Sequence, residues 1–115
     1  MNSHDLKKYI LIYVMEFTLA GAYYRPDNIR AFLRDLTEPV NVHLVPDPLN
    51  RVDRNAIKVV YNDMHLGFVP AIATNKFKQF SKATLIPSDD EFYKEQPTIK
   101  INSSDIVFYE MIHDS

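Results

Sequence analysis

The chain of 115 residues contains no cysteine, no tryptophan and only two glycines, Gly21 and Gly67. The absence of cysteine excludes a disulfide framework and thiolate metal sites, and it suits a reducing compartment, so we expect a cytoplasmic protein. Two isolated glycines are too few for a glycine-rich phosphate-binding loop. Several common classes of secreted protein and nucleotide-dependent enzyme are therefore excluded before any motif is considered.

The sequence also has no apolar run that is long enough to cross a bilayer, so we expect no membrane association. Residues 9–15, followed by Ala20, Gly21 and Ala22, imitate a secretory signal, but the run is short and Glu16 interrupts it. We instead predict a strand over residues 9–19. Its first half is apolar on both faces, which suits a barrel strand covered on both sides or an edge that meets a second copy.

Constellations for catalysis or for metal binding are missing as well. The four histidines are His4, His43, His65 and His113. They lie far apart, without a second ligand at the spacing that a zinc site needs. Residues 89–91 are acidic, and we interpret them as a surface loop rather than a cation site. No nucleophile and base stand at a useful spacing, so we expect a binding protein with no cofactor and no enzymatic activity.

The composition is that of one ordinary globular domain, which we expect to span residues 1–115, with 46% apolar and 24% charged residues. The net charge of −2 hides an uneven distribution. Residues 51–82 carry six basic and two acidic side chains, whereas residues 83–115 carry two basic and seven acidic ones. A local basic surface attracts phosphates. The alternative is that this imbalance has no functional meaning.

Helical periodicity appears in two places. After Pro26 one apolar stripe is formed by Ile29, Phe32, Leu33 and Leu36. We expect Asp27 or Asn28 to cap this helix, with Arg30 and Arg34 on its outer face, either solvated or near a phosphate backbone. A second helix is predicted over residues 70–82. Its buried face is expected to include Val69, Ile72, Ala73, Phe77 and Phe80.

Strands are predicted at residues 40–45, 56–61, 66–69, 83–86, 99–101 and 106–112. Val40, Val42 and Leu44 are expected to face the core, and residues 62–65 are expected to form a four-residue turn. The last two strands resemble a hairpin, and residues 9–15 are a candidate partner for its final strand. Six or seven strands and two short helices predict a mainly β fold, a small and nearly closed barrel.

The stretch from residue 50 to 70 organises the rest of the chain. It begins with a polar loop in which Asn50, Asp53 and Asn55 are spaced to hydrogen-bond nearby backbone and hold an irregular turn in one shape. An apolar strand, a turn and a second short strand follow. On residue types alone, this stretch could be no more than a well-tied hairpin.

Its residues nevertheless resemble the core signature of the HIRAN domain family. The shared pattern is Asn50-x-x-Asp53-x-Asn55-Ala56-Ile57-x-Val59, followed by Gly67-Phe68-Val69-Pro70 and preceded by Gly21-Ala22-Tyr23-Tyr24. The resemblance is strongest over residues 15–82, and residues 83–115 add C-terminal strands and an acidic loop. It implies a small OB/SH3-like β-barrel that captures the free 3′ end of single-stranded DNA in DNA repair or replication-fork processing, with a helicase or nuclease as a possible partner.

The resemblance also implies roles for individual residues. Tyr23 and Tyr24 match aromatic residues that stack on the last bases, Asp53 matches an aspartate that reads the terminal hydroxyl, and Asn50 opens the loop. The departures are Ala22 for an arginine, Val52 for an aromatic residue, and Phe68 and Ala71 for a histidine and a lysine. Arg51, Arg54 and Lys58 are expected to supply the missing positive charge, and we keep Phe68 among the expected site residues.

Two functions from different classes follow from these residues. The first is a non-enzymatic nucleic-acid-binding module that recognises single-stranded DNA or DNA ends. The alternative is a protein-interaction or self-association module that keeps the barrel without DNA-end binding. The apolar residues 9–15 favour the alternative, because they could form a homodimer through the N-terminal strand.

Overall fold

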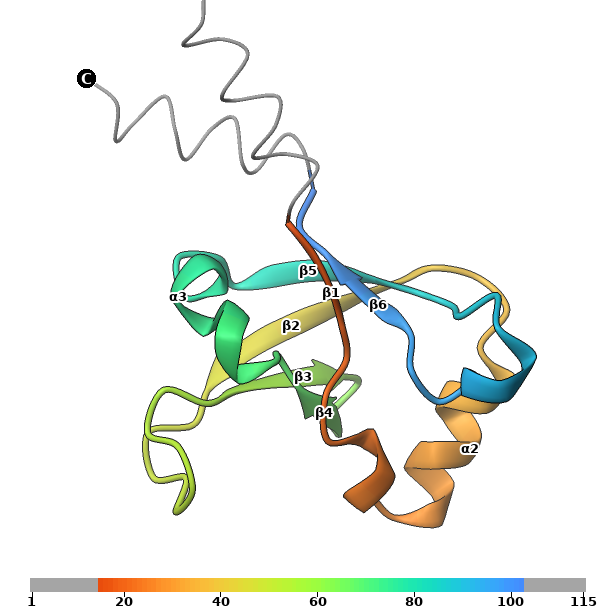
Figure 1. The fold of residues 1–115 in the computed structure, drawn as a ribbon, viewed down its shortest axis with the longest axis horizontal. Helices are drawn as coiled ribbons and strands as arrows, with labels where there is room; N and C mark the ends of the chain where they lie inside the picture. The colour runs from red at the N-terminus through yellow and green to blue at the C-terminus, as the bar shows by residue number, and fades with distance from the viewer. Residues whose placement is uncertain (1–14, 103–115) are drawn as a thin grey trace, which may run out of the picture.

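The computed structural model describes residues 15–102, and its core is one six-stranded antiparallel sheet (Figure 1). The spatial order of the strands is β1-β6-β5-β2-β3-β4. Their bounds are β1 Glu16–Thr18, β2 Val40–Pro46, β3 Ile57–Tyr61, β4 Met64–Phe68, β5 Lys82–Ile86 and β6 Thr98–Lys100. The prediction of a mainly β protein with two short helices is confirmed.

The sheet curls until its two edges meet at one point, so it is a half-barrel. Ala20, two residues after β1, exchanges two backbone hydrogen bonds of 2.8 Å with Phe68 at the end of β4. Gly67 makes this approach possible, because a Cβ at that position would lie 2.6 Å from the carbonyl oxygen of Ala20. The bridge thus brings the segment after β1 against the end of β4.

The central strands follow the alternation that the sequence predicted. Val42 and Leu44 of β2 are buried and Val40 packs against the core, as expected. β3 and β4 form the predicted hairpin, but its turn is shorter than four residues. Asn62 and Asp63 alone connect the strands, with φ angles of 47° and 65°. This left-handed pair matches the twist of the hairpin, so the next two residues already belong to β4.

Helix α2, Asp27–Asp35, confirms the first helical prediction. Ile29 and Leu33 are buried, and Phe32 and Leu36 pack against the same core. The expected side-chain cap is wrong. Pro26 occupies the N-cap position, and no side chain of the described residues accepts a hydrogen bond there. The fixed φ of proline supports the helix start in its place.

The predicted helix over residues 70–82 is much shorter than expected. The segment consists of a 3₁₀ turn, η2 Ala71–Ala73, and one turn of α-helix, α3 Thr74–Phe77. Ala73 and Phe77 are fully buried and Val69 is buried, whereas Ile72 is 87% exposed. Phe80 packs against the core from its edge. The expectation that Ile72 is buried is therefore wrong, because the chain does not keep one helical phase across these residues.

One hydrophobic core contains Ile57, Val59 and Phe77 together with buried residues of α2, β2, β4, β5 and β6. β5 confirms the strand predicted near residue 83, and the loop before β6 contains a 3₁₀ turn, η3 Glu91–Tyr93. β1 pairs with β6. The predicted strand over residues 106–112 and most of the apolar segment 9–15 lie outside the described residues.

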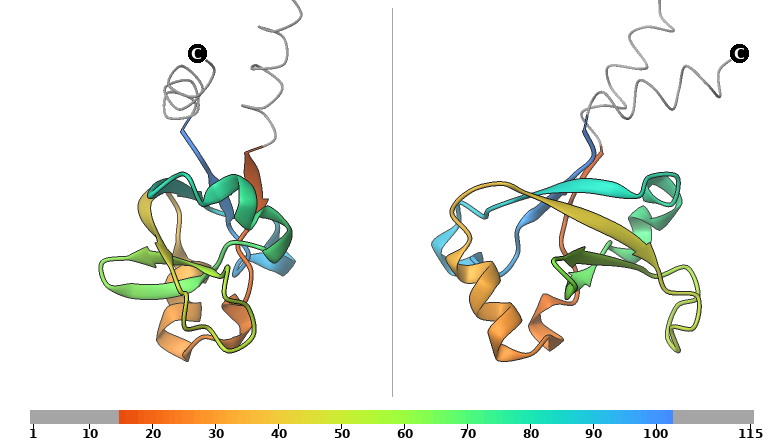
Figure 2. Two further views of the ribbon diagram at one scale, coloured as in Figure 1. Left: turned by 90° about the vertical axis from the view of Figure 1, so that its left-hand side faces the viewer. Right: turned by 180° about the vertical axis from the view of Figure 1, so that it is seen from behind.

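The two ends of the fold carry different elements. Residues 47–56, which we call the signature loop, lie with α3 at one end, and α2 lies with η3 at the other (Figures 1 and 2). The 3₁₀ turn η1, Ala22–Tyr24, precedes α2. Between residues 15 and 102, no helix is long and apolar enough to span a membrane.

Candidate nucleic-acid interface

The signature loop is held in shape by the side chains of Asn50 and Asp53, as the spacing predicted, whereas Asn55 contributes its backbone N–H. The Asn50 side-chain oxygen accepts hydrogen bonds from the backbone N–H groups of Val52 and Asp53, at 2.9 and 3.0 Å. Its Nδ2 donates to Asp47 Oδ2 at 3.1 Å. Asp53 Oδ1 accepts from the Asn55 N–H at 2.8 Å. The Asn50 side chain thus makes three hydrogen bonds within the loop and holds its shape.

Asp53 differs from Asn50 because only one of its two carboxylate oxygens accepts a hydrogen bond within the loop. Its Oδ2 makes no hydrogen bond to any residue between 15 and 102. An ionised carboxylate oxygen without a partner is a strong acceptor for a hydroxyl group of a ligand. Asp53 can therefore hold the loop with one oxygen and bind a ligand with the other.

A hollow of about 270 Å³ lies beside the signature loop, and we call it the Asp53 hollow. It is lined by Ala20, Gly21, Asn50, Val52, Asp53, Ala56, Phe68, Val69 and Ala71. Three of the predicted site residues, Asn50, Asp53 and Phe68, are brought together here from two separate segments. The bridge between Ala20 and Phe68 supplies the opposite wall. The surface is mostly apolar, with Asp53 as its charged group.

Tyr23 and Tyr24 do not line the Asp53 hollow, although Gly21 does. Gly21 adopts a left-handed φ of 73°, which turns the chain sharply into η1. Both tyrosines are strongly exposed, at 72% and 85%, and their rings meet edge to face at 5.4 Å. The guanidinium of Arg30 lies 5.2 Å from the centre of the Tyr23 ring. Tyr24 therefore offers an exposed ring next to the segment that lines the hollow, whereas Arg30 lies over one face of Tyr23.

The predicted cations occupy two places. Arg51 and Arg54 line a wide depression of about 670 Å³ along the outer side of the signature loop. Lys58 lies on β3 directly opposite Phe68 of β4 and is half-buried. None of these three cations forms an ion pair with a carboxylate within residues 15–102.

His65 is a site neighbour that the sequence did not reveal. Its ring packs edge-on against Phe68 at 4.7 Å, and its Nε2 is buried without a hydrogen-bond partner among the described residues. Burial, followed by the positive charges of Arg25 and Lys58, lowers the pKa of His65 below its ordinary value of 6.5. The neutral form is therefore favoured, and the ring acts as part of the packing behind Phe68.

Arg30 and Arg34 of α2 do not remain free for phosphates. Arg30 Nε donates to Glu95 Oε2 at 3.0 Å, and Arg34 Nη1 donates to Glu95 Oε1 at 2.7 Å. We call these three residues the Glu95 surface. Desolvation alone would raise the pKa of Glu95, but the hydrogen bonds from Arg30 and Arg34 outweigh it and lower that pKa. The carboxylate bridges both arginines, which neither alternative for this pair anticipated.

Among residues 15–102, no group of three histidine, aspartate or glutamate side chains is arranged to hold a metal ion. The candidate interface therefore consists of the Asp53 hollow, the Asp53 carboxylate with one oxygen free of hydrogen bonds to residues 15–102, the exposed tyrosines, and three cations without a carboxylate partner among those residues.

Comparison with known protein families decides the classification. The family model of the HIRAN domain matches residues 12–107, nearly the whole chain. The chain belongs to the HIRAN domain family. HIRAN domains are DNA-binding modules rather than catalytic domains. No curated protein and no solved structure gives a match.

Within this HIRAN domain, the positions that depart from the expected signature gather around one place. Val52, Phe68 and Ala71 all line the Asp53 hollow, whereas Ala22 is buried. The sequence named these residues but contained no signal that they share a wall. Their proximity depends on the bridge between residues 20 and 68, a contact that no local pattern predicts.

Proposed function

We propose that this HIRAN domain binds single-stranded DNA at a free 3′ end, without enzymatic activity of its own. One observation carries the proposal. Asp53, whose second carboxylate oxygen is free of hydrogen bonds to the described residues, lies in an apolar hollow that Asn50 and Phe68 also line. A terminal nucleotide needs an apolar surface for its base or sugar and an acceptor for its hydroxyl, and both are present here.

The chemistry of each group fits this ligand. Stacking on an aromatic ring contributes about 1–3 kcal/mol per base irrespective of sequence, and Tyr23 and Tyr24 are exposed enough to provide it. The terminal 3′ hydroxyl donates to Asp53 Oδ2, and Arg51 and Arg54 attract the phosphates. Val52 is aliphatic and 97% exposed, so it offers no stacking face. We therefore expect weaker binding than in a domain with an aromatic residue there.

The test compares single strands that end in a 3′ hydroxyl with strands that end in a 3′ phosphate. We expect wild type to prefer the hydroxyl by about tenfold or more, because a hydrogen bond to a charged group contributes about 1.5–3 kcal/mol. Asp53→Asn should lose this preference while it keeps the oxygen that accepts from Asn55. Asp89→Ala, at an exposed acidic position, is the matched control.

Phosphate-driven binding should survive in Asp53→Asn, because the arginines remain. Equal affinity of wild type for both kinds of end, measured by fluorescence anisotropy, would contradict end capture. Failure to bind any single strand at moderate salt would contradict the whole proposal.

A protein-interaction module is the second candidate. Leu49 and Val52 of the signature loop are 90% and 97% exposed, and Ile72 of η2 is 87% exposed. Exposed large apolar side chains of this kind are candidate contacts for a protein partner. If a protein is the ligand, replacing Leu49 and Ile72, which do not line the Asp53 hollow, with serine should abolish its capture while leaving single-strand affinity unchanged. Self-association through residues 9–15, giving a homodimer, remains part of this candidate and is testable by sedimentation.

We place this domain in DNA repair or replication-fork processing, beside a helicase or nuclease partner, in the cytoplasm. We also propose that the half-barrel is a relative of OB/SH3-like barrels. The two-bond bridge between Ala20 and Phe68 supports this relation, since it joins the edges of the curled sheet.

A further inference from the structure

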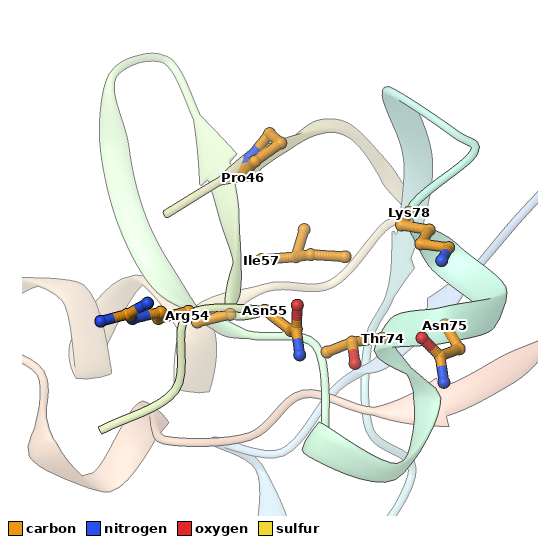
Figure 3. Close-up of a pocket in the computed structure, with 8 residues that line it drawn as sticks. Pro46, Arg54, Asn55, Ile57, Thr74, Asn75 and Lys78 are labelled. Carbon is orange, nitrogen blue, oxygen red and sulfur yellow. The ribbon is translucent and has the colours of Figure 1, made fainter. Parts of the chain in front are cut away.

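A second concave site lies between the end of the signature loop and α3. This groove, which we call the α3 groove, has a volume of about 160 Å³. It is lined by Pro46, Arg54, Asn55, Ala56, Ile57, Thr74, Asn75 and Lys78. Figure 3 shows Asn55 on the loop side and Thr74, Asn75 and Lys78 on the helix side, with Ile57 between them.

The polar groups of the α3 groove suit an anion. Lys78 contributes an ammonium group that pairs with no carboxylate within residues 15–102. Asn55 and Asn75 contribute side-chain amides, and no aspartate or glutamate lines the groove. A site with two cations in its lining, amide donors and no carboxylate favours a phosphate oxygen over a cation.

The α3 groove adjoins the Asp53 hollow on both of its sides. Ala56 lines both concavities on the loop side. On the other side Ala71 lines the hollow and Thr74 lines the groove, and the Thr74 hydroxyl donates to the Ala71 carbonyl at 3.1 Å. The two concavities are therefore neighbours between the signature loop and the segment 71–78.

Arg54 lies on the loop side of the α3 groove. Its side chain extends away from Thr74, Asn75 and Lys78 in Figure 3, and it also lines the depression on the outer side of the loop. Lys78 is consequently the cation that faces the α3 groove from the helix, whereas Arg54 is available to phosphates on the loop side.

We propose that the α3 groove binds an internal phosphodiester of the same single strand whose 3′ end occupies the Asp53 hollow. Lys78 neutralises the phosphate, and the amides of Asn55 and Asn75 donate to its oxygens. This inference rests on the proposed function and adds to it a direction for the strand, from the hollow towards α3. Affinity should therefore increase when the strand becomes long enough to reach the groove.

The experiment uses 5′-fluorescein-labelled oligothymidylates of two and eight nucleotides with free 3′ hydroxyl ends, titrated at several salt concentrations. Lys78→Gln should weaken binding of the longer strand several-fold at low salt. It should also flatten the slope of log affinity against log salt by about 0.7, the value for one phosphate contact on a single strand. Binding of the dinucleotide should be unchanged.

Two further variants make the result specific. Asn75→Asp places a negative charge in the groove with almost no change of shape, and it should weaken the longer strand at least as much. Lys94→Gln is the matched control, since it removes the same charge from the segment beside α2, where Lys94 Nζ donates to the Ser88 carbonyl. Thermal unfolding of each variant shows whether the fold is kept.

The outcomes separate the two proposals. If wild type binds the eight-nucleotide strand but Lys78→Gln and Asn75→Asp behave as Lys94→Gln does, the α3 groove is not a phosphate site and end capture still stands. If wild type prefers neither the longer strand nor a free 3′ hydroxyl, the proposed function and this inference are both overturned.

Discussion

This HIRAN domain carries two arginine pairs on its surface, and only one pair is left without a carboxylate partner and so available to phosphates. On the Glu95 surface, Arg30 and Arg34 share one carboxylate at 3.0 and 2.7 Å. On the signature loop, Arg51 and Arg54 have no carboxylate partner among residues 15–102. The surfaces lie at opposite ends of the fold (Figures 1 and 2).

The difference shows that the availability of a basic side chain for a phosphate depends on its ion-pair partners as well as on its position in the sequence. The excess of six basic over two acidic residues in segment 51–82 matters because its arginines stay unpaired, whereas the arginines of α2 are neutralised from 61 and 65 residues away. An ion pair that spans such a separation cannot be read from spacing along one helix. Variants of the two surfaces and of the residues around them test this difference.

The largest expected effect comes from Gly67→Ala. The added Cβ would lie 2.6 Å from the Ala20 carbonyl oxygen, and overpacking of this kind costs about 1–3 kcal/mol. The bridge that forms the wall of the Asp53 hollow should be displaced, so single-strand binding should fall as well. Urea unfolding measures the stability, and wild-type stability together with wild-type binding would contradict the role given to the bridge.

The second-largest effect is expected on the salt dependence of single-strand binding, when arginines of the two surfaces are replaced. Arg51→Gln or Arg54→Gln should each flatten the salt dependence of single-strand binding by about 0.7, which corresponds to one phosphate contact. Arg34→Gln is the matched change on the Glu95 surface, and it should leave the slope unchanged because Arg34 is already paired. Equal slopes for all three variants would remove the contrast.

A smaller effect is expected for Glu95→Gln, with a loss of about 0.2–1 kcal/mol at neutral pH. Because the pKa of Glu95 is lowered in the folded state, its contribution is present above the ordinary value of 4.5 and is lost as the pH falls through the lower folded value. The variant and wild type should therefore converge in acid, as urea unfolding at several pH values can check. A difference as large in acid as at neutral pH would argue against the ion pair as its cause.

The smallest effect concerns His65. Its lowered pKa means that the unfolded chain binds the proton more readily, so stability should decrease as the pH falls below about 6.5 and level off below the folded pKa. His65→Gln should remove this decrease, whereas His43→Gln, at an exposed position of β2, should keep it. Thermal unfolding between pH 5 and 7.5 measures both, and an unchanged pH dependence in His65→Gln would identify another group.

Much of the fold could be predicted because its signals are local. The alternation in β2, the apolar stripe of α2 and the paired strands β3 and β4 each follow from a few neighbouring residues. The helix over residues 70–82 failed because tertiary pairing overrode its periodicity. Lys82 pairs with His43 across β5 and β2, so the chain must leave the helix soon after Phe77.

The candidate site was predictable only in part, for a similar reason. The hydrogen bonds of Asn50 and Asp53 close over two or three residues, and their spacing announces them. The Asp53 hollow needs Ala20 against Phe68, and the α3 groove needs Asn55 opposite Asn75. Those distances are set by the curl of the sheet, which no short pattern encodes.

Chemical-shift mapping by NMR tests whether the signature-loop end, and not the α2 end, binds nucleic acid. Backbone amide resonances of the ¹⁵N-labelled protein would be followed while an oligothymidylate with a free 3′ hydroxyl is added. We predict shifts concentrated at residues 21–24, 50–56 and 71–78, with the amides of residues 34 and 95 unmoved. Shifts centred on α2 and Glu95, or no shifts at all, would contradict the account.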